Sequence, residues 1–333
     1  MFDGALPEVY GLLKHITHAS SCGEDDVYAR LITDVLEFEW KQEREGFSAT
    51  VLPIMSCTIA GGEIEKAIPV AAGWRALYVA AKLMDDVEDG DRVNIADKSI
   101  PAEIAINLGT GFIGLANLAF LVKRKTHHQL DEKAKIEIGV EFNRTMLHMA
   151  SGQHRDISID NPVNMEEYRE IMSAKSGSFF QLATWAGARC ATDDETILSL
   201  FEMVGYNLGM MLQLNDDLKD FQQKEPGNDI ERGRVTFPLL YAFSVASPYE
   251  KKRLQELMIQ ATHDTDAANN VRELVRMLGG EMYVLAEIMR YRRRTLRVLD
   301  EMKLSKESRR EMEKWLSILS IKRKYPHQPN NNI

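Results

Sequence analysis

The sequence predicts an all-α protein folded as a single large helical bundle. Apolar residues recur every three to four positions along most of the 333 residues, as on one face of an α-helix. No segment shows the strict alternation of a half-buried β-strand. Turn-forming pairs interrupt the helical pattern at Gly61-Gly62, Asn161-Pro162, Pro226-Gly227 and Gly279-Gly280.

The expected helices follow one another with short connections. No Pro/Ser-rich linker or internal repeat divides the chain, so one domain is expected over residues 1–325, with a polar, frayed tail over 326–333. In chain order, the periodicity predicts helices over residues 5–19, 26–43, 48–60, 64–88, 102–125, 130–151, 166–188, 194–221, 234–247, 249–261, 266–277, 280–302 and 306–321.

Composition narrows the class of protein. The chain has 44% hydrophobic and 27% charged residues, the balance of a folded globular protein. Its net charge of −9 argues against a nucleic-acid binder. The sparse cysteines Cys22, Cys57 and Cys190 favour a reducing compartment without a disulfide framework. The first residues resemble no signal peptide, so we expect a cytoplasmic protein.

One stretch is long enough to cross a membrane. Residues 104–122 contain no charge over 19 positions. Asn107, Thr110 and Asn117 interrupt its apolar surface, however, and its three glycines allow close helix packing. We therefore favour a buried helix of a large bundle over a membrane span.

Two acidic clusters each end a long apolar helix. Within each cluster the first and last aspartates are four positions apart, so they share one helical face. The clusters, both of the form DDxxD, consist of Asp85, Asp86 and Asp89, and of Asp216, Asp217 and Asp220.

This spacing indicates metal binding. Like charges four positions apart destabilise a helix by about a few tenths of a kcal/mol, and burial raises carboxylate pKa values unless a cation neutralises them. Carboxylates suit Mg²⁺, which bridges them to substrate phosphates. Two facing clusters are predicted to hold magnesium ions against a diphosphate and to neutralise charge on the leaving group. Either cluster alone would be interpreted as a solvated acidic helix end.

Together, the clusters resemble the two aspartate-rich motifs of the trans-isoprenyl diphosphate synthase (polyprenyl synthetase) superfamily. The resemblance covers roughly residues 45 to 325. It implies an isoprenoid-synthase bundle with a central cavity, usually a homodimer, and catalysis by the six aspartates with Mg²⁺, three ions being expected. The substrate would be an allylic prenyl diphosphate.

Other segments carry the same resemblance. GQHRDI at 152–157 is similar to the family's GQxxDL segment, and Lys175-Ser176 to its Lys-Thr pair. DIERGRVTFPLL at 229–240 is similar to DLxxGKxTLPL, with Arg234 in place of lysine, and AINLGTG at 105–111 to the helix after the first motif. The resemblance implies that the diphosphate is bound by Gln153, Lys175, Gln213 and Arg234, together with Arg92.

Departures from the family pattern are concentrated around a second substrate site. The stretch EGFSATVLPIM at 45–55 has no Lys or Arg where the family carries a GKRxRP-like motif for isopentenyl diphosphate. Tyr78 and Met84 replace histidines, and Arg92 and Lys98 replace paired arginines. A second diphosphate needs cationic partners, so binding of isopentenyl diphosphate in the usual way is not expected.

The pocket for the prenyl chain is expected beside the first motif. Ala80 and Ala81 are small where large aromatics shorten the pocket in the family, which implies room for about fifteen to twenty carbons (C15–C20). Tyr78, Phe112 and Phe179 are the aromatic candidates for its wall, with Phe180 and Trp185, although core packing explains such residues equally well.

Three functions remain open. In the first, the enzyme transfers a prenyl group to an acceptor that need not be isopentenyl diphosphate, as in the related branch that prenylates pheromone peptides. Alternatively, it is a class I terpene synthase, in which the carbocation is cyclised or quenched without a second diphosphate. A third alternative is a non-catalytic partner subunit, which two complete motifs make the weakest of the three.

Overall fold

Helices form nearly all of the regular structure. The computed structural model describes residues 2–23, 26–45, 48–90, 92–95, 98–122, 130–158, 164–223, 228–302 and 304–319. The all-α prediction is confirmed. Contacts divide the chain into a first unit, residues 1–159 and 173–206, and a second unit, residues 160–172 and 207–333. The single domain expected over residues 1–325 stays a prediction, and the expected tail at 326–333 lies outside the described residues.

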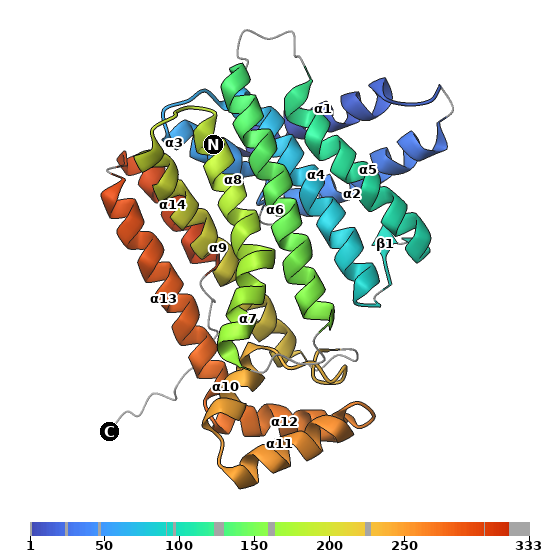
Figure 1. Cartoon of the computed structure of the whole chain (residues 1–333), viewed down its shortest axis with the longest axis vertical. Helices are drawn as coiled ribbons and strands as arrows, with labels where there is room; N and C mark the ends of the chain where they lie inside the picture. The colour runs from blue at the N-terminus through green and yellow to red at the C-terminus, as the bar shows by residue number, and fades with distance from the viewer. Residues whose placement is uncertain are drawn as a thin grey trace, which may run out of the picture. The chain divides into compact units, whose positions relative to one another are not determined.

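The first unit contains the helices from the amino terminus through α6, together with α8 and the first part of α9 (Figure 1). Its elements are a 3₁₀-helix Phe2–Ala5, α1 Leu6–Ala19, α2 Val27–Glu45, α3 Val51–Ile59, α4 Ile64–Glu88, β1 Asn94–Ile95, β2 Lys98–Ser99, α5 Ala102–Leu121, α6 Glu132–Ser158, a π-helix Ser173–Gly177, α8 Ser178–Arg189 and the first part of α9 Glu195–Gln222.

Its core is built around α4, because this helix buries most of its length. Trp74 is fully buried and stacks on Phe179 of α8 with ring centroids 4.5 Å apart. Close approach of α8 to α3 depends on Gly187, where a Cβ atom would lie 2.1 Å from the carbonyl oxygen of Pro53. The small β1–β2 hairpin pairs Asn94 with Ser99 and was not expected from the sequence.

A buried ionic network joins α2 to α4. The Arg75 guanidinium pairs with Glu39, and with Glu43 at 3.3 Å. Glu43 also accepts hydrogen bonds from the hydroxyls of Tyr10 at 2.8 Å and Thr50 at 2.7 Å. Each carboxylate therefore keeps a donor in place of water, as buried charges require.

The second unit holds the second acidic motif and the carboxyl-terminal helices. Its elements are α7 Met165–Met172, the later part of α9, α10 Phe237–Val245, α11 Pro248–Ala261, α12 Thr265–Met277, α13 Gly280–Glu301 and α14 Lys306–Leu319. Ser247 and Glu250 form a capping box at the start of α11. Gly279 has a φ of 87°, which permits the turn between α12 and α13.

Two helix predictions need correction. The helix expected over residues 166–188 contains the π-helix Ser173–Gly177, and the helix expected to end at 151 continues to Ser158. α5 and α9 are both long and apolar enough to cross a membrane, and 44% and 56% of their most apolar windows are buried. The helix expected over residues 104–122 is α5, which buries one face and exposes the other.

Candidate active site

Lys175 lies at the centre of an ion cluster in the first unit. Its Nζ atom is 2.7 Å from Asp156 Oδ2 and 3.4 Å from Asp85 Oδ1. Burial would lower the pKa of Lys175, but the two carboxylates outweigh this effect and raise it. The ammonium group is therefore charged at neutral pH and is held beside the first aspartate of the first motif.

The π-helix sets the position of Lys175. Such a turn widens the helix by one residue and is often found at functional sites. Close packing against α6 is possible because residue 152 is glycine: a Cβ atom there would lie 2.7 Å from the Ala174 Cβ and 3.2 Å from the Lys175 Cγ. The glycine of the GQHRD segment thus has a packing role.

Gln153 follows this glycine and has unused hydrogen-bonding capacity. Both its amide nitrogen and its amide oxygen are buried without a hydrogen-bond partner among the described residues. An unsatisfied buried amide costs about 1–3 kcal/mol. This cost is removed if a bound polar group pairs with the amide, which supports the predicted diphosphate contact.

The first motif lies at the carboxyl end of α4. The backbone N–H of Asp89 donates to the carbonyl of Asp85, so the two side chains lie one helical turn apart, and 47% of the Asp85 side chain is exposed. No group of three His, Cys, Asp or Glu side chains able to hold a metal ion occurs within the described residues. A pair of carboxylates still fits Mg²⁺, which completes its octahedron with water and phosphate oxygens.

The two adjacent aspartates of the second motif differ in environment. Asp216 has a side chain that is 66% exposed. Asp217 is 3% exposed, and its carboxylate accepts hydrogen bonds from Gln213 Nε2 at 3.1 Å, Tyr168 Oη at 2.9 Å and the Phe237 N–H at 3.4 Å. The geometry favours Asp216 as a metal ligand and Asp217 as a residue that positions the end of α9. Gln213 was predicted to contact the diphosphate, and in the structure its amide donates to Asp217.

Asp220 and Asp229 form a second carboxylate pair in the same unit. The backbone N–H of Asp229 donates to Asp220 Oδ2 at 2.8 Å. Burial and the charges of Asp220 and Asp217 raise the pKa of Asp229 to about 7, although Arg234 opposes the shift. This places the predicted phosphate-binding Arg234 in the turn beside the motif, where its N–H donates to the Asp229 carbonyl at 2.8 Å.

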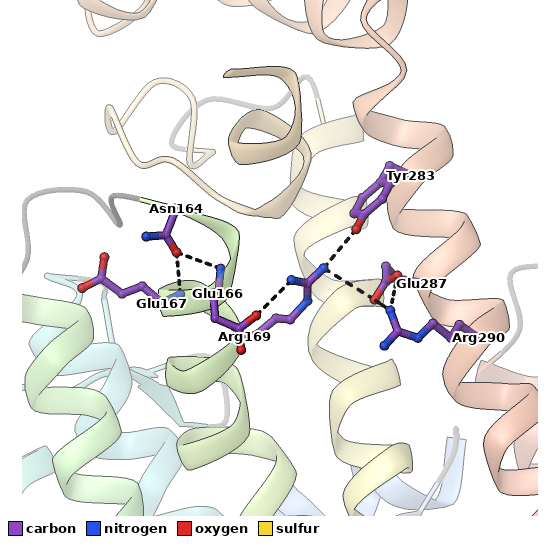
Figure 2. Close-up of polar contacts among 7 residues, drawn as sticks. All are labelled: Asn164, Glu166, Glu167, Arg169, Tyr283, Glu287 and Arg290. Atoms are coloured by element: carbon purple, nitrogen blue, oxygen red, sulfur yellow. Dashed lines mark hydrogen bonds and ion pairs between the residues drawn. The ribbon is translucent and has the colours of Figure 1, made fainter. Parts of the chain in front are cut away.

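A polar network links the start of α7 and Arg169, the residue after Tyr168, to α13 (Figure 2). Asn164 caps α7 by accepting hydrogen bonds from the N–H groups of Glu166 and Glu167, each at 2.9 Å. The neighbour of Tyr168, Arg169, donates to the Tyr283 hydroxyl at 3.0 Å and lies 3.8 Å from the Glu287 carboxylate.

The same network fixes α7 against α13. Glu287 is buried and also pairs with Arg290 at 3.0 Å, while the Arg169 guanidinium covers the Phe237 ring at 5.3 Å. Arg169 and Glu287 therefore anchor the helix from which Tyr168 reaches the second motif.

Tyr168→Phe tests this support. The change keeps the ring, which packs 6.0 Å from Phe237, and removes the only hydroxyl that donates to Asp217 among the described residues. Because a hydrogen bond to a charged group contributes about 1.5–3 kcal/mol, we expect turnover to fall about tenfold or more and the Mg²⁺ requirement to rise. Tyr249→Phe, an exposed change in the same unit, should leave both unchanged, and equal Mg²⁺ titrations for the two variants would contradict the assignment.

The buried acids also predict a dependence of stability on pH. Burial raises the pKa of Asp217 to about 6 and that of Asp229 to about 7. The folded protein then binds more protons than the unfolded chain between about pH 4 and pH 7, so the metal-free protein should lose stability as pH rises through this window. Urea unfolding in EDTA should show a lower midpoint at about pH 8 than at about pH 5. Asp229→Asn should flatten this slope, and an unchanged slope would show that Asp229 is not responsible.

The structure separates the predicted chain-pocket residues into two groups. Tyr78 and Phe179 are brought together, with ring centroids 6.1 Å apart. Ala80 and Phe112 are buried in the helices α4 and α5, and Ala81 is half-buried. Trp185 instead lines a cavity of about 210 Å³ between α6, α8 and α9, to which none of the other predicted chain-pocket residues contributes.

The stretch that departs from the family pattern folds into the core. Thr50, Leu52 and Pro53 are buried, and Thr50 donates to the carboxylate of Glu43. This part of the chain presents no cation to a second diphosphate. Arg92, the remaining predicted phosphate contact, is exposed between α4 and β1.

Three residues of the site were missed from the sequence. Asp156 stands in the GQHRD segment and Asp229 opens the DIERGR segment, so both signals were present in motifs already identified. Tyr168 stands in no such motif, and only the fold brings it to Asp217.

Comparison with known proteins identifies the family. A family model described as Polyprenyl synthetase matches residues 29–277. A geranylgeranyl pyrophosphate synthase of Penicillium canescens is 26% identical over 199 residues, 57% of this chain and 56% of that protein. Variediene synthase of Aspergillus brasiliensis is 24% identical over 231 residues, 62% of this chain and 32% of that protein. The chain thus spans about half or less of these relatives.

The fold also has solved counterparts. The crystal structure of geranylgeranyl pyrophosphate synthetase from Pyrococcus horikoshii matches with a TM-score of 0.75 at 20% identity. The match covers 95% of this chain and 98% of that one. At this identity the likeness concerns the fold alone.

Proposed function

Because the chain belongs to the polyprenyl synthetase family, we propose that it is a magnesium-dependent prenyltransferase. It ionises an allylic prenyl diphosphate of about C15–C20 and transfers the prenyl group to an acceptor. The observation that carries the proposal is the ion cluster of Lys175, Asp85 and Asp156, with the unsatisfied Gln153 amide on the same helix as Asp156.

These residues supply the contacts that a leaving diphosphate needs. Lys175 provides a charged donor held in place by two acids, and Gln153 provides an amide donor without a partner among the described residues. Such preorganised donors stabilise charge that develops on the leaving group. The proposed magnesium ligands are Asp85 and Asp89 in the first unit and Asp216 and Asp220 in the second, with Asp86 and Asp217 adjoining them. When bound, Mg²⁺ would act as a Lewis acid on the phosphate oxygens.

One assay tests the proposal. The protein and Mg²⁺ are incubated with geranyl, farnesyl or geranylgeranyl diphosphate, with and without isopentenyl diphosphate, and the products are identified by mass spectrometry. Release of diphosphate that requires Mg²⁺ and an allylic substrate supports the proposal. A longer diphosphate formed only with isopentenyl diphosphate would show that the second site exists after all. No reaction with any substrate or acceptor would favour a non-catalytic subunit.

A second candidate is a class I terpene synthase. Two observations favour it: the buried, uncharged stretch around Thr50 offers no cation to a second diphosphate, and variediene synthase is among the relatives. A cyclisation or quenching reaction needs one diphosphate only. A hydrocarbon or alcohol formed from a single allylic substrate would identify this activity in the same assay.

We also propose a homodimer formed by the outer face of α5 and α6. These helices pack together through Phe120 and Phe142, with ring centroids 5.0 Å apart. Their outer face exposes large apolar side chains, which soluble monomers seldom gather in one patch. These side chains are Leu118 and Leu121 on α5 and Ile136, Val140 and Leu147 on α6.

Light scattering tests the dimer. Ile136→Lys with Leu147→Lys places two charges on side chains that are 66% and 75% exposed, so folding should be retained while a dimer dissociates into monomers. The control is Ile259→Lys on α11, which should remain dimeric. A monomeric unmodified protein would refute the proposal, and a dimeric double variant would exclude this face.

A further inference from the structure

The outward face of α13 carries a cluster of positive charge on an acidic protein. Arg290, Arg293, Arg294 and Arg297 are all exposed, and their spacing of three and four places them on one side of the helix. We call these four residues the basic face. The whole chain has a net charge of −9, so this concentration of arginine is local and opposite in sign.

Little of this charge is neutralised within the protein. Arg290 pairs with Glu287. Arg293 donates to the Met289 carbonyl at 3.3 Å, Arg294 covers the Tyr291 ring at 5.4 Å, and Arg297 has no ion pair or hydrogen bond with the described residues.

The acids of α13 leave an excess of positive charge on this helix. Asp300 pairs with Arg309 of α14, and Glu281 pairs with Arg276 of α12. Glu287 is buried and already pairs with one arginine of the basic face, and Glu301 is exposed at the end of the helix. The other three arginines of the basic face therefore have no acidic partner among the described residues.

Apolar side chains continue the basic face toward the start of α13. Met282 is 57% exposed and Met289 is 43% exposed. They lie on the same side of the helix as Arg293, since residues three, four and seven apart share a face. Together with the arginines they extend over about 22 Å of helix.

We propose that this face of α13 docks on an anionic lipid surface. Arginine forks suit phosphate groups, and a peripheral helix places basic side chains among lipid headgroups and apolar ones just below them. A nucleic acid would use the arginines but would gain little from two exposed methionines. The lipid surface therefore accounts for both kinds of side chain.

Docking on a membrane would suit an enzyme that acts on prenyl diphosphates. Prenyl substrates and products of this length are amphipathic and partition into membranes, so a membrane-bound enzyme meets a higher local concentration of them. This benefit rests on the proposed function, whereas the docking itself does not depend on it.

Vesicle sedimentation of the full chain tests the proposal. We expect at least about tenfold stronger partitioning onto phosphatidylcholine vesicles that contain phosphatidylglycerol than onto phosphatidylcholine alone, and loss of this binding in high salt. Arg293→Glu with Arg297→Glu should reduce the binding about tenfold or more. Met282→Ser with Met289→Ser should weaken binding while its salt dependence remains.

A matched variant controls for net charge. Lys251→Glu with Lys252→Glu changes two exposed residues of α11 in the same unit and alters the net charge equally, so it should bind vesicles as the unmodified protein does. The proposal would be overturned if the Lys251/Lys252 variant lost as much vesicle binding as the Arg293/Arg297 variant. Equal binding of the unmodified protein to both kinds of vesicle would also overturn it. Tighter binding to duplex DNA than to anionic vesicles would likewise overturn it.

Two further measurements separate the possible failures. Thermal unfolding shows that each variant is folded, and prenyl-diphosphate turnover without vesicles should be unchanged in all of them. Vesicle binding without any turnover would support the docking and reject the proposed function. Turnover without vesicle binding would support the proposed function and reject the docking.

Discussion

Replacing Asp85 or Asp216 by alanine is expected to lower turnover of an allylic diphosphate by about 100-fold or more in each case. Both side chains are partly exposed at the ends of long helices, so their carboxylates are accessible to a metal ion. Asp85 also pairs with Lys175, so its loss would remove a proposed metal ligand and loosen a proposed phosphate donor together. Product formation with saturating Mg²⁺ is the measurement.

The fold should survive both changes. Lys175 keeps Asp156 at 2.7 Å when Asp85 is removed, so its largely buried charge retains a partner, and Asp216 is 66% exposed. Asp193→Ala, an exposed acid that lies 3.8 Å from Lys133, is the matched control and should retain full turnover. Near-normal turnover in both motif variants would refute the assignment of these aspartates to magnesium.

Replacing Arg75 by methionine is expected to destabilise the protein by about 3–5 kcal/mol. The change keeps most of the side-chain volume but leaves Glu39 and Glu43 buried without their guanidinium partner. A buried carboxylate that has lost its counter-charge carries most of its desolvation cost. The urea midpoint of unfolding should therefore fall markedly, with the loss seen also in the thermal transition.

A compensating variant separates lost charge from lost packing. Combining Arg75→Met with Glu39→Gln and Glu43→Gln removes the carboxylate charges that have lost Arg75, of which Glu39 keeps only Lys82 at 3.3 Å, and leaves an acceptor for Tyr10 and Thr50. Most of the stability should return, because neutral amides cost less to bury than carboxylates. The network would be shown to contribute little if the free energy of unfolding of Arg75→Met lay within about 1 kcal/mol of that of the unmodified protein. The same would follow if the triple variant were no more stable than Arg75→Met alone.

The helices and the positions of the aspartates at helix ends could be predicted because both depend on local spacing. The apolar period marks helices such as α4, α9 and α13 to within a few residues, and the DDxxD spacing marks the aspartates. The π-helix could not be predicted, since the apolar period does not reveal a single wider turn that packs closely on Gly152. Likewise, Asp216 and Asp217 are the same residue type, and only the fold distinguishes them, by burying Asp217 against Tyr168, Gln213 and Phe237.

The buried position of Thr50 also could not be derived. The sequence shows that the cations of a second phosphate site are missing, but not what replaces them. In the structure, Glu43 accepts the Thr50 hydroxyl and Arg75 reaches the same carboxylate from α4. This stretch therefore takes part in a buried polar network, which the sequence alone does not reveal.

The π-helix makes the site sensitive to the number of residues as well as to their identity. Its turn holds one residue more than α-helical winding allows, so deleting a single residue between 173 and 177 would let the helix become regular. The flanking helical segments would keep their orientation, because the deleted residue is the surplus one, but the side chains of the turn itself would be redistributed, and the Lys175 ammonium would leave its two acids. An insertion or deletion of one residue in this turn is therefore expected to harm the enzyme more than most substitutions there, and natural relatives should vary in side chains at these positions while conserving their count.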